Sequence, residues 1–332
     1  MPDHSSSAAQ PFATLSPDCL WNALDSVGLH GDGRLLALNS YENRVYQVGM
    51  DEGPPLVVKV YRPNRWSDAA ILEEHQYLFQ LAEAELPVVP PLRLAGATLH
   101  ERQGFRFAVF PRQGGRVPEL AGSAILERMG RLIGRIHAVG ATTSFQARPS
   151  LDSASFGDEP RTYLIEQGWV PAELVPSYRS VTDQALERIR RLFDRAGPYQ
   201  TLRLHGDCYP GNILWTDDGP HFVDFDDSRS GPAIQDLWML LAGDRQERGT
   251  QLADLLAGYD CFFDFDTREI QLIEALRTLR MLHYAAWLAR RWSDPAFPRA
   301  FTWFNTSAYW QDHILSLREQ VAAMDEPPLW SS

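Results

Sequence analysis

The apolar positions near the start of the chain change from a helical to a strand-like period. Residues 12–29 carry apolar side chains at helical spacing, and Ser16 followed by Pro17 is typical of a helix start. The runs RVYQVGM and PLVVKVY are rich in β-branched and aromatic residues and flank a proline-containing turn. They therefore predict a β-hairpin.

The next hundred residues alternate between the same two patterns. Residues 68–84 predict a helix with one apolar face, whereas the following LPVVPPL is too rich in proline for a helix and predicts an extended segment. The stretch TLHERQGFRFAVF predicts two strands across a Gly-containing turn. Residues 110–115 carry two glycines and are a candidate hinge.

Helical periodicity dominates beyond residue 115. Four segments predict helices: 123–139, 181–196, 247–259 and 268–292. The chain thus divides into a small sheet-rich lobe and a larger helical lobe, which predicts an α+β fold. We assign residues 1–11 to a disordered tail, 12–111 to the first lobe and 112–332 to the second.

Composition narrows the class of protein. With 332 residues, 44% of them hydrophobic, the chain can bury a sizeable core in about two lobes. A net charge of -12 disfavours non-specific binding to nucleic acid or an anionic membrane. No apolar run is long enough to span a bilayer, and the first residues lack a signal-peptide pattern. Three widely separated cysteines fit a reducing compartment, so we expect a cytoplasmic protein. We also expect a monomer.

The segment LHGDCYPGNILW, residues 204–215, places Asp207 and Asn212 five positions apart, just before an apolar run. A second run, HFVDFDD, follows a strong turn signal. If the runs pair as an antiparallel hairpin around a five-residue loop, Asn212 lies opposite Asp224. Directly opposed residues have Cβ atoms about 5 Å apart. An amide oxygen and a carboxylate would then meet beside Asp207.

Such a pair of oxygen atoms suits Mg²⁺. This ion takes one or two protein oxygens and completes its shell with water and substrate phosphates. The nearby carboxylate of Asp207 could accept a proton from an alcohol that attacks a phosphate. The local pattern therefore points to phosphoryl transfer.

The same residues resemble a known family. The tripeptide HGD at 205–207, followed by Asn212, matches the catalytic-loop pattern H-x-D-x-x-x-x-N, and DFD at 224–226 stands where protein kinases carry Asp-Phe-Gly. These forms resemble the aminoglycoside phosphotransferase and choline kinase branch of the kinase-like fold. With LNSYENRVYQ, VVKVYRP and RRWSDPAFP, the chain is similar over residues 38–298 to the bacterial stress response kinase A proteins.

The resemblance implies a bilobal protein-kinase-like fold that uses ATP and Mg²⁺. It makes Asp207 the catalytic residue that positions and deprotonates the acceptor hydroxyl. Asn212 and Asp224 would bind magnesium, which also makes Asp224 catalytic. Asp226, two residues further on the same strand face, would support this magnesium ion indirectly or bind a second metal ion. Asp236 resembles a buried aspartate that braces the catalytic loop.

The resemblance also assigns the nucleotide-binding residues. Lys59, in the strand VVKV, would steady the ATP phosphates, with Glu74 as its partner and Glu73 as the alternative. The glycine-rich phosphate loop of protein kinases is missing, and residues 39–43 (NSYEN) occupy its position. A serine at this place touches nucleotide in similar proteins, so Ser40 is carried over. Its hydroxyl and nearby N–H groups could donate to phosphate.

Other residues near these motifs have plainer interpretations. We expect His205 and His137 to be packed histidines. Cys208, beside the catalytic aspartate, is expected to be a packed cysteine, with a redox-sensitive thiol as the alternative. The stretch LRMLHYAAWLARRW predicts a core helix with arginines along a solvated edge. The alternative makes that edge part of an acceptor-binding surface.

The resemblance implies an ATP- and Mg²⁺-dependent kinase that phosphorylates Ser or Thr of a protein, without nucleic-acid or membrane partners. Two alternatives stay open. The first is a small-molecule kinase that acts on an aminoglycoside, choline or a homoserine-like alcohol. The second is a nucleotide-binding pseudokinase scaffold, against which the intact Asp207, Asn212, Asp224 and Lys59 argue.

Overall fold

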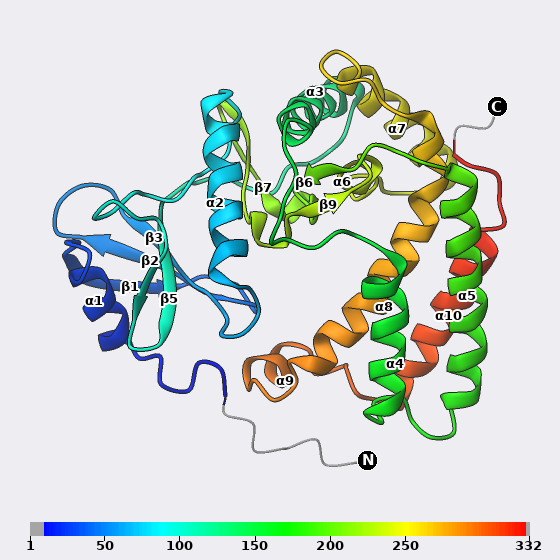
Figure 1. Ribbon diagram of the computed structural model, residues 1–332, viewed down its shortest axis with the longest axis horizontal. Coiled ribbons are helices and arrows are strands. Elements are labelled where there is room, and N and C mark those ends of the chain that lie inside the picture. The colour runs from blue at the N-terminus through cyan, green and yellow to red at the C-terminus, as the bar shows by residue number, and fades with distance from the viewer. Residues whose placement is uncertain (1–9, 330–332) are drawn as a thin grey trace.

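In the computed structural model, which describes residues 10–329, the first lobe is built around a five-stranded antiparallel sheet (Figure 1). The strands lie in the order β1-β2-β3-β5-β4. Their bounds are β1 Gly31–Ala37, β2 Arg44–Met50, β3 Leu56–Val60, β4 His100–Arg102 and β5 Phe105–Pro111. The predicted hairpin is β2–β3 and the second predicted pair is β4–β5. The strand β1 was not predicted, because GDGRLLA contains two glycines and no β-branched residue.

Alternation along β3 sends neighbouring side chains to opposite faces of the sheet. Val58 and Val60 are buried in a core shared with α1, Pro17–Asp25. Lys59 leaves from the opposite face, toward α2, Asp68–Glu83. The period of two in VVKV thus fixes which side chain enters the space between the lobes.

The first two helices follow the predicted segments with different limits. Helix α1 is shorter than 12–29 but starts as expected, since the Ser16 hydroxyl accepts the N–H of Cys19 at 3.2 Å. Helix α2 matches 68–84 closely. The disordered tail expected for residues 1–11 falls almost wholly outside the described residues, and the limits set for the two domains stay a prediction.

Helices make up most of the second lobe (Figure 1). They are α3 Ser123–Gly140, α4 Glu159–Glu166, α5 Val175–Ala196, α6 Ile234–Trp238, α7 Arg245–Tyr259, α8 Ile273–Arg290, α9 Ala296–Ala300 and α10 Ser307–Ala323. The segment predicted as one helix over 268–292 begins as a 3-10 helix, Thr267–Leu272, before α8. No helix was predicted for α4, α6, α9 or α10. Within residues 10–329, no helix is both long and apolar enough to cross a bilayer.

Helices α3 and α7 pack side by side through glycines (Figure 1). A Cβ atom built on Gly130 of α3 would lie 1.9 Å from the Leu255 carbonyl oxygen of α7. One on Gly258 of α7 would lie 2.0 Å from the Glu127 carbonyl oxygen. Because the obstacles are backbone atoms, any side chain at these positions would force the two helices apart.

We expect Gly130→Ala to destabilise the protein by about 1–3 kcal/mol, because the added methyl group overpacks the α3–α7 contact. Gly249→Ala in α7 is the matched control, since its Cβ would meet only the Leu329 carbonyl oxygen at 3.7 Å. That change should be neutral or stabilise by up to about 1 kcal/mol through helix propensity. Denaturant unfolding of both variants provides the measurement, and equal midpoints would refute the packing argument.

Candidate active site

The hairpin expected after residue 212 forms, but in a different register. Strands β7, Ile213–Thr216, and β8, Gly219–Phe222, are joined by a two-residue turn instead of a five-residue loop. The Thr216 hydroxyl stabilises this turn by donating to the Gly219 carbonyl at 3.1 Å. Two-residue connections are the commonest in hairpins, and here the shorter turn shifts every opposed pair by one residue.

The shift changes the partner of Asn212. Its carbonyl accepts the N–H of Val223 at 3.0 Å, so the predicted opposition of Asn212 and Asp224 was wrong by one residue. Asp224 instead takes a left-handed conformation with φ 59° and ψ 62°, and the chain enters a 3-10 turn at Phe225–Asp227. Asp226 therefore does not share a strand with Asp224, which corrects a second expectation.

Because of this left-handed turn, the carboxylates of Asp224 and Asp226 lie in different surroundings. The Asp224 side chain is 56% exposed and lines the cavity between the lobes, whereas that of Asp226 is 4% exposed. Desolvation of the carboxyl group inside the cavity raises the pKa of Asp224, and the carboxylates of Asp226, Asp227 and Asp207 reinforce this shift while Lys59 opposes it. This excess of negative charge is what a divalent cation would relieve.

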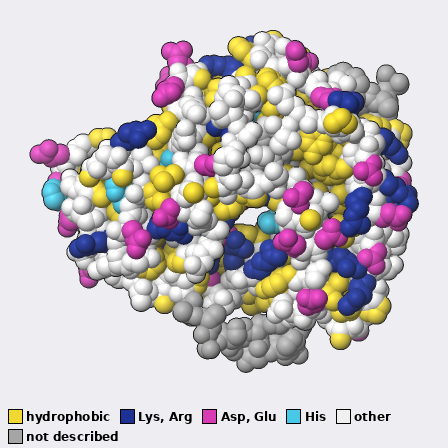
Figure 2. Space-filling view, in the orientation of Figure 1, with side chains coloured by type: hydrophobic (Ala, Val, Ile, Leu, Met, Phe, Trp, Pro, Cys, Tyr) yellow, Lys and Arg dark blue, Asp and Glu magenta, His cyan; other side chains and the backbone are white. Residues whose placement is uncertain are grey.

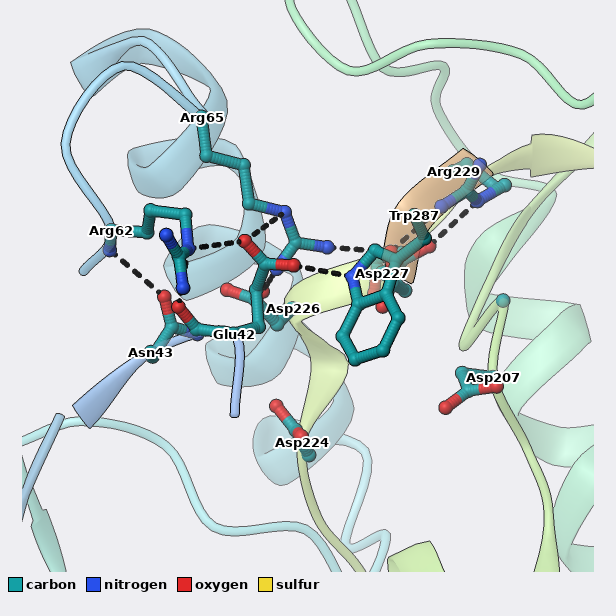
Figure 3. Close-up of polar contacts among 12 residues, drawn as sticks. Glu42, Asn43, Arg62, Arg65, Asp207, Asp224, Asp226, Asp227, Arg229 and Trp287 are labelled. Carbon is teal, nitrogen blue, oxygen red and sulfur yellow. Dashed lines mark hydrogen bonds and ion pairs between the residues drawn. The ribbon is translucent and has the colours of Figure 1, made fainter. Parts of the chain in front are cut away.

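The loop between β6, Leu202–Leu204, and β7 carries Asp207 and Asn212. The Asn212 amide nitrogen donates to the Asp207 carbonyl oxygen at 2.9 Å and lies 3.3 Å from the carboxylate Oδ2. The amide oxygen of Asn212, the atom suited to Mg²⁺, takes no part in these bonds. Asp207 and Asp224 both line the cavity, and Figure 3 shows that they come from separate segments with a space between them.

A buried aspartate binds backbone N–H groups of this loop, as expected. Asp236 of α6 accepts the backbone N–H of His205 at 2.8 Å and of Gly206 at 2.9 Å. Its other neighbour is the His137 ring at 3.1 Å. Burial alone would raise the pKa of Asp236, but the hydrogen bond with His137 and those from the backbone hold it below its ordinary value. Gly206 has φ 85°, and a Cβ there would lie 2.2 Å from the Asp227 carbonyl oxygen.

His205 and Cys208 of this loop are packed, as predicted. The His205 ring lies 3.0 Å from the Val223 carbonyl oxygen and against the Phe225 ring, with centroids 4.3 Å apart. Burial raises the pKa of the Cys208 thiol well above its ordinary value. A thiol held protonated is a poor redox sensor, so the packed interpretation of Cys208 stands.

Lys59, the only lysine in the chain, lies among three carboxylates. Its Nζ is 2.9 Å from Asp226 Oδ1, 3.3 Å from Glu74 Oε1 and 3.5 Å from Asp224 Oδ1. Burial favours the neutral amine, but the charges of Asp226 and Glu74 raise the pKa of Lys59 well above its ordinary value. Glu73 instead accepts backbone N–H groups at residues 146–148, so Glu74 is the residue that contacts Lys59.

Arg148 completes this buried network and was not predicted. Its guanidinium pairs with Glu74 at 2.8 Å and donates to the carbonyl oxygens of Ala70, Asp226 and Ser228 at 2.8–2.9 Å. It thereby ties α2 to the turn after Asp224. Its sequence context, QARPS, contains no signal for this role.

The 39–43 loop is fastened to the second lobe (Figure 3). Ser40 donates to the Asn43 carbonyl at 3.2 Å, and its place in the cavity lining is consistent with the expected nucleotide contact. Glu42 accepts from the Trp287 indole of α8 at 2.5 Å and pairs with Arg62 at 3.0 Å and with Arg291. These contacts close the loop over the cavity.

The cavity has a volume of 690 Å³ and opens as a hollow between the lobes (Figure 2). One end is apolar, and its lining includes Leu38, Val45, Val57, Leu78, Phe110, Leu214 and Phe222. The other end is polar and lies beyond Asp207 and Asp224. Its lining includes Arg65, Asp227, Arg229, Arg280, His283, Tyr284 and Trp287.

Helix α8 therefore contributes more than a solvated arginine edge. Arg280 pairs with Asp207 Oδ1 at 2.5 Å, and Tyr284 and Trp287 line the same end of the cavity. This arrangement agrees with the alternative in which the helix forms an acceptor-binding surface. Its pairing with Asp207 could not be predicted, because the two residues are separated by 73 positions.

The donor set fits a magnesium ion that also binds phosphate. Among residues 10–329, no three His, Cys, Asp or Glu side chains form a ready metal site. Asn212 and Asp224 offer two oxygens, and Mg²⁺ in phosphoryl-transfer sites takes most other ligands from water and phosphates. The geometry can thus place a nucleotide, a cation and an acceptor hydroxyl around Asp207.

Comparison with known proteins agrees with this geometry. The family model described as "Phosphotransferase enzyme family" matches residues 34–273. The chain belongs to this family. Over 322 residues, 97% of each chain, the phosphotransferase is 45% identical to the stress response kinase A of Escherichia coli strain K12. Over 318 residues, 96% of each chain, it is 45% identical to the serine/threonine protein kinase RdoA of Salmonella typhimurium strain LT2.

A solved structure shares the fold of the phosphotransferase. The amicoumacin kinase in complex with AMP-PNP, Ca²⁺ and Ami has a TM-score of 0.70 and 18% identity, over 92% of both chains. The bilobal α+β fold and the resemblance inferred from the motifs are confirmed. The phosphotransferase is an enzyme of the kinase class.

We expect Arg148→Met to destabilise the phosphotransferase by about 3–5 kcal/mol, because three buried carbonyl oxygens lose their donor and Glu74 keeps only Lys59 as a cationic partner. Arg131→Met is the control, since Arg131 forms an exposed pair with Glu127 whose loss should cost less than about 1 kcal/mol. Denaturant midpoints compare the two. Similar midpoints would show that the buried network does not hold the lobes together.

Proposed function

We propose that this phosphotransferase transfers the γ-phosphoryl group of Mg-ATP to a Ser or Thr hydroxyl of a protein. One observation carries the proposal: Asp207, Asn212, Asp224 and Lys59 line a single cavity between the lobes. The 45% identity to a protein named as a serine/threonine kinase supports a protein acceptor. ATP as donor and three free cysteines support a cytoplasmic location.

Each residue has a separate task in this mechanism. The apolar end of the cavity accommodates a base, and Lys59 offsets the charge of the phosphates. The Ser40 hydroxyl lies where it can donate to a phosphate oxygen. Asn212 and Asp224 would hold Mg²⁺, which supplies positive charge to the β- and γ-phosphates when bound.

Asp207 orients the acceptor for the transfer itself. Its carboxylate accepts the hydroxyl proton while the hydroxyl oxygen bonds to the γ-phosphorus. The bond from the γ-phosphorus to the β–γ bridging oxygen breaks, and ADP leaves. Since the protein forms no covalent bond, the rate depends on positioning and charge, which the braced loop and the ion pair with Arg280 provide.

A small-molecule acceptor is the second candidate. The amicoumacin kinase, which shares the fold, was solved with AMP-PNP, Ca²⁺ and Ami bound. The cavity beyond Asp207 is also a pocket large enough for a small alcohol. A pseudokinase scaffold is the third candidate, and it predicts nucleotide binding without transfer.

We expect Asp224→Ala to abolish Mg²⁺-dependent nucleotide binding, because it removes a cation ligand. Asp207→Asn should leave binding intact and lower transfer at least about 100-fold, because it removes the proton acceptor. Nucleotide affinity with and without Mg²⁺ is measured for both variants, together with transfer of labelled γ-phosphate. Equal loss of binding in both would contradict the separate roles.

The same assay distinguishes the acceptors. Wild type is incubated with labelled ATP and either a generic protein acceptor, cell-extract proteins or a set of amine-bearing alcohols, with Asp207→Asn alongside. Label on protein Ser or Thr in wild type alone supports the protein kinase. Label only on an alcohol supports a metabolite kinase, and nucleotide binding without any transfer supports the scaffold.

A further inference from the structure

Arg280 presents a partly open cation at the polar end of the cavity. Its Nη1 atom lies 2.5 Å from Asp207 Oδ1, while 42% of its side chain is exposed. Among the described residues, Asp207 is the only hydrogen-bond or ion-pair partner of this guanidinium. Arginine has five N–H donors, so most of them remain for a molecule that enters beside Asp207.

The carboxylates on this side of the cavity are already paired. Asp226 is engaged by Lys59 and Arg65, and Asp227 by Arg65 and Arg229. Glu42 is likewise paired with arginines and the Trp287 indole. A cationic acceptor would therefore have to break an existing ion pair, at a desolvation cost, to find a carboxylate here.

Aromatic rings continue the surface that begins at Arg280. Tyr284 and Trp287 follow at i+4 and i+7, which places all three side chains on one face of α8. The two rings are stacked, with centroids 5.6 Å apart and planes 15° apart, and Tyr284 is 39% exposed. We name Arg280, Tyr284 and Trp287 the acceptor wall.

We propose that the acceptor wall selects an acidic peptide segment, with Arg280 binding an anionic group next to the accepting Ser or Thr. This inference rests on the proposed protein kinase function. The contact between Arg280 and Asp207 sets the distance, because an anion on the free N–H groups of Arg280 lies beside the hydroxyl that Asp207 orients. The aromatic rings then provide a flat surface for the next residues of the peptide.

The experiment compares peptides that differ in one side chain. Purified full-length protein phosphorylates four peptides in which the acceptor Ser is preceded by Asp, phosphoserine, Asn or Lys. For wild type, kcat/KM should fall from the Asp peptide to the Lys peptide by about fivefold or more, as expected for one partly exposed charge pair. The phosphoserine peptide distinguishes a phosphate from a carboxylate as the preferred anion.

Variants assign the preference to Arg280. Arg280→Gln should raise KM for the Asp peptide toward that of the Asn peptide, and Arg280→Glu should make the Lys peptide the better substrate. Arg195→Gln is the control, because Arg195 is an exposed arginine on α5 and lies outside the cavity lining. Nucleotide binding is measured for every variant to show that each has folded.

Three results would overturn the inference. Equal kcat/KM for all peptides in wild type would show that the acceptor wall does not distinguish the charge of the residue before the acceptor Ser. A uniform fall in kcat for every peptide in Arg280→Gln would make Arg280 a residue that only positions Asp207 or the γ-phosphate. Phosphorylation of an amine-bearing alcohol but of no peptide would overturn the proposed function as well, so the two failures are distinguishable.

Discussion

Four buried charges, those of Lys59, Glu74, Arg148 and Asp226, hold the two lobes in one arrangement. Removing such groups from water costs several kcal/mol each, so the fold tolerates them only where each meets an opposite charge. They come from the sheet, from α2, from the segment before α4 and from the turn after Asp224. A shift of any of these elements would leave a buried charge unpaired. Because the elements belong to both lobes, this constraint also fixes the distance between the lobes and hence the width of the cavity.

The two sides of the cavity are held in different ways. The loop with Asp207 rests on buried hydrogen bonds that run through Asp236 and His137 to the Tyr259 hydroxyl of α7. The 39–43 loop is held by ion pairs and by contacts of the Tyr41 ring with Phe297 and Phe301. Both sides of the cavity are thus fixed by the second lobe, the catalytic loop by α6 and the 39–43 loop by α8 and α9.

The sequence predicted those parts of the site whose residues lie close together in the chain. The spacing of Asp207 and Asn212 and the alternation around Lys59 depend only on local geometry. The register of β7 and β8 was missed because the length of the turn decides it. Arg148 and Arg280 were missed because their partners lie 74 and 73 positions away. Helix α10 could have been found, since its buried Trp310, His313, Ile314 and Leu317 follow helical spacing.

The chain has only one lysine, and this lysine lies in the site. The chain contains 31 Lys and Arg residues, and Lys59 is the single lysine among them, with 8% of its side chain exposed. Arginines carry every other basic role and do not react with acylating reagents under mild conditions. An amine-directed acyl probe therefore finds one side-chain target, which is buried among the ion pairs that join the lobes. The rate at which the probe reacts with Lys59 therefore reports how often these ion pairs open, and the measurement needs no engineered label.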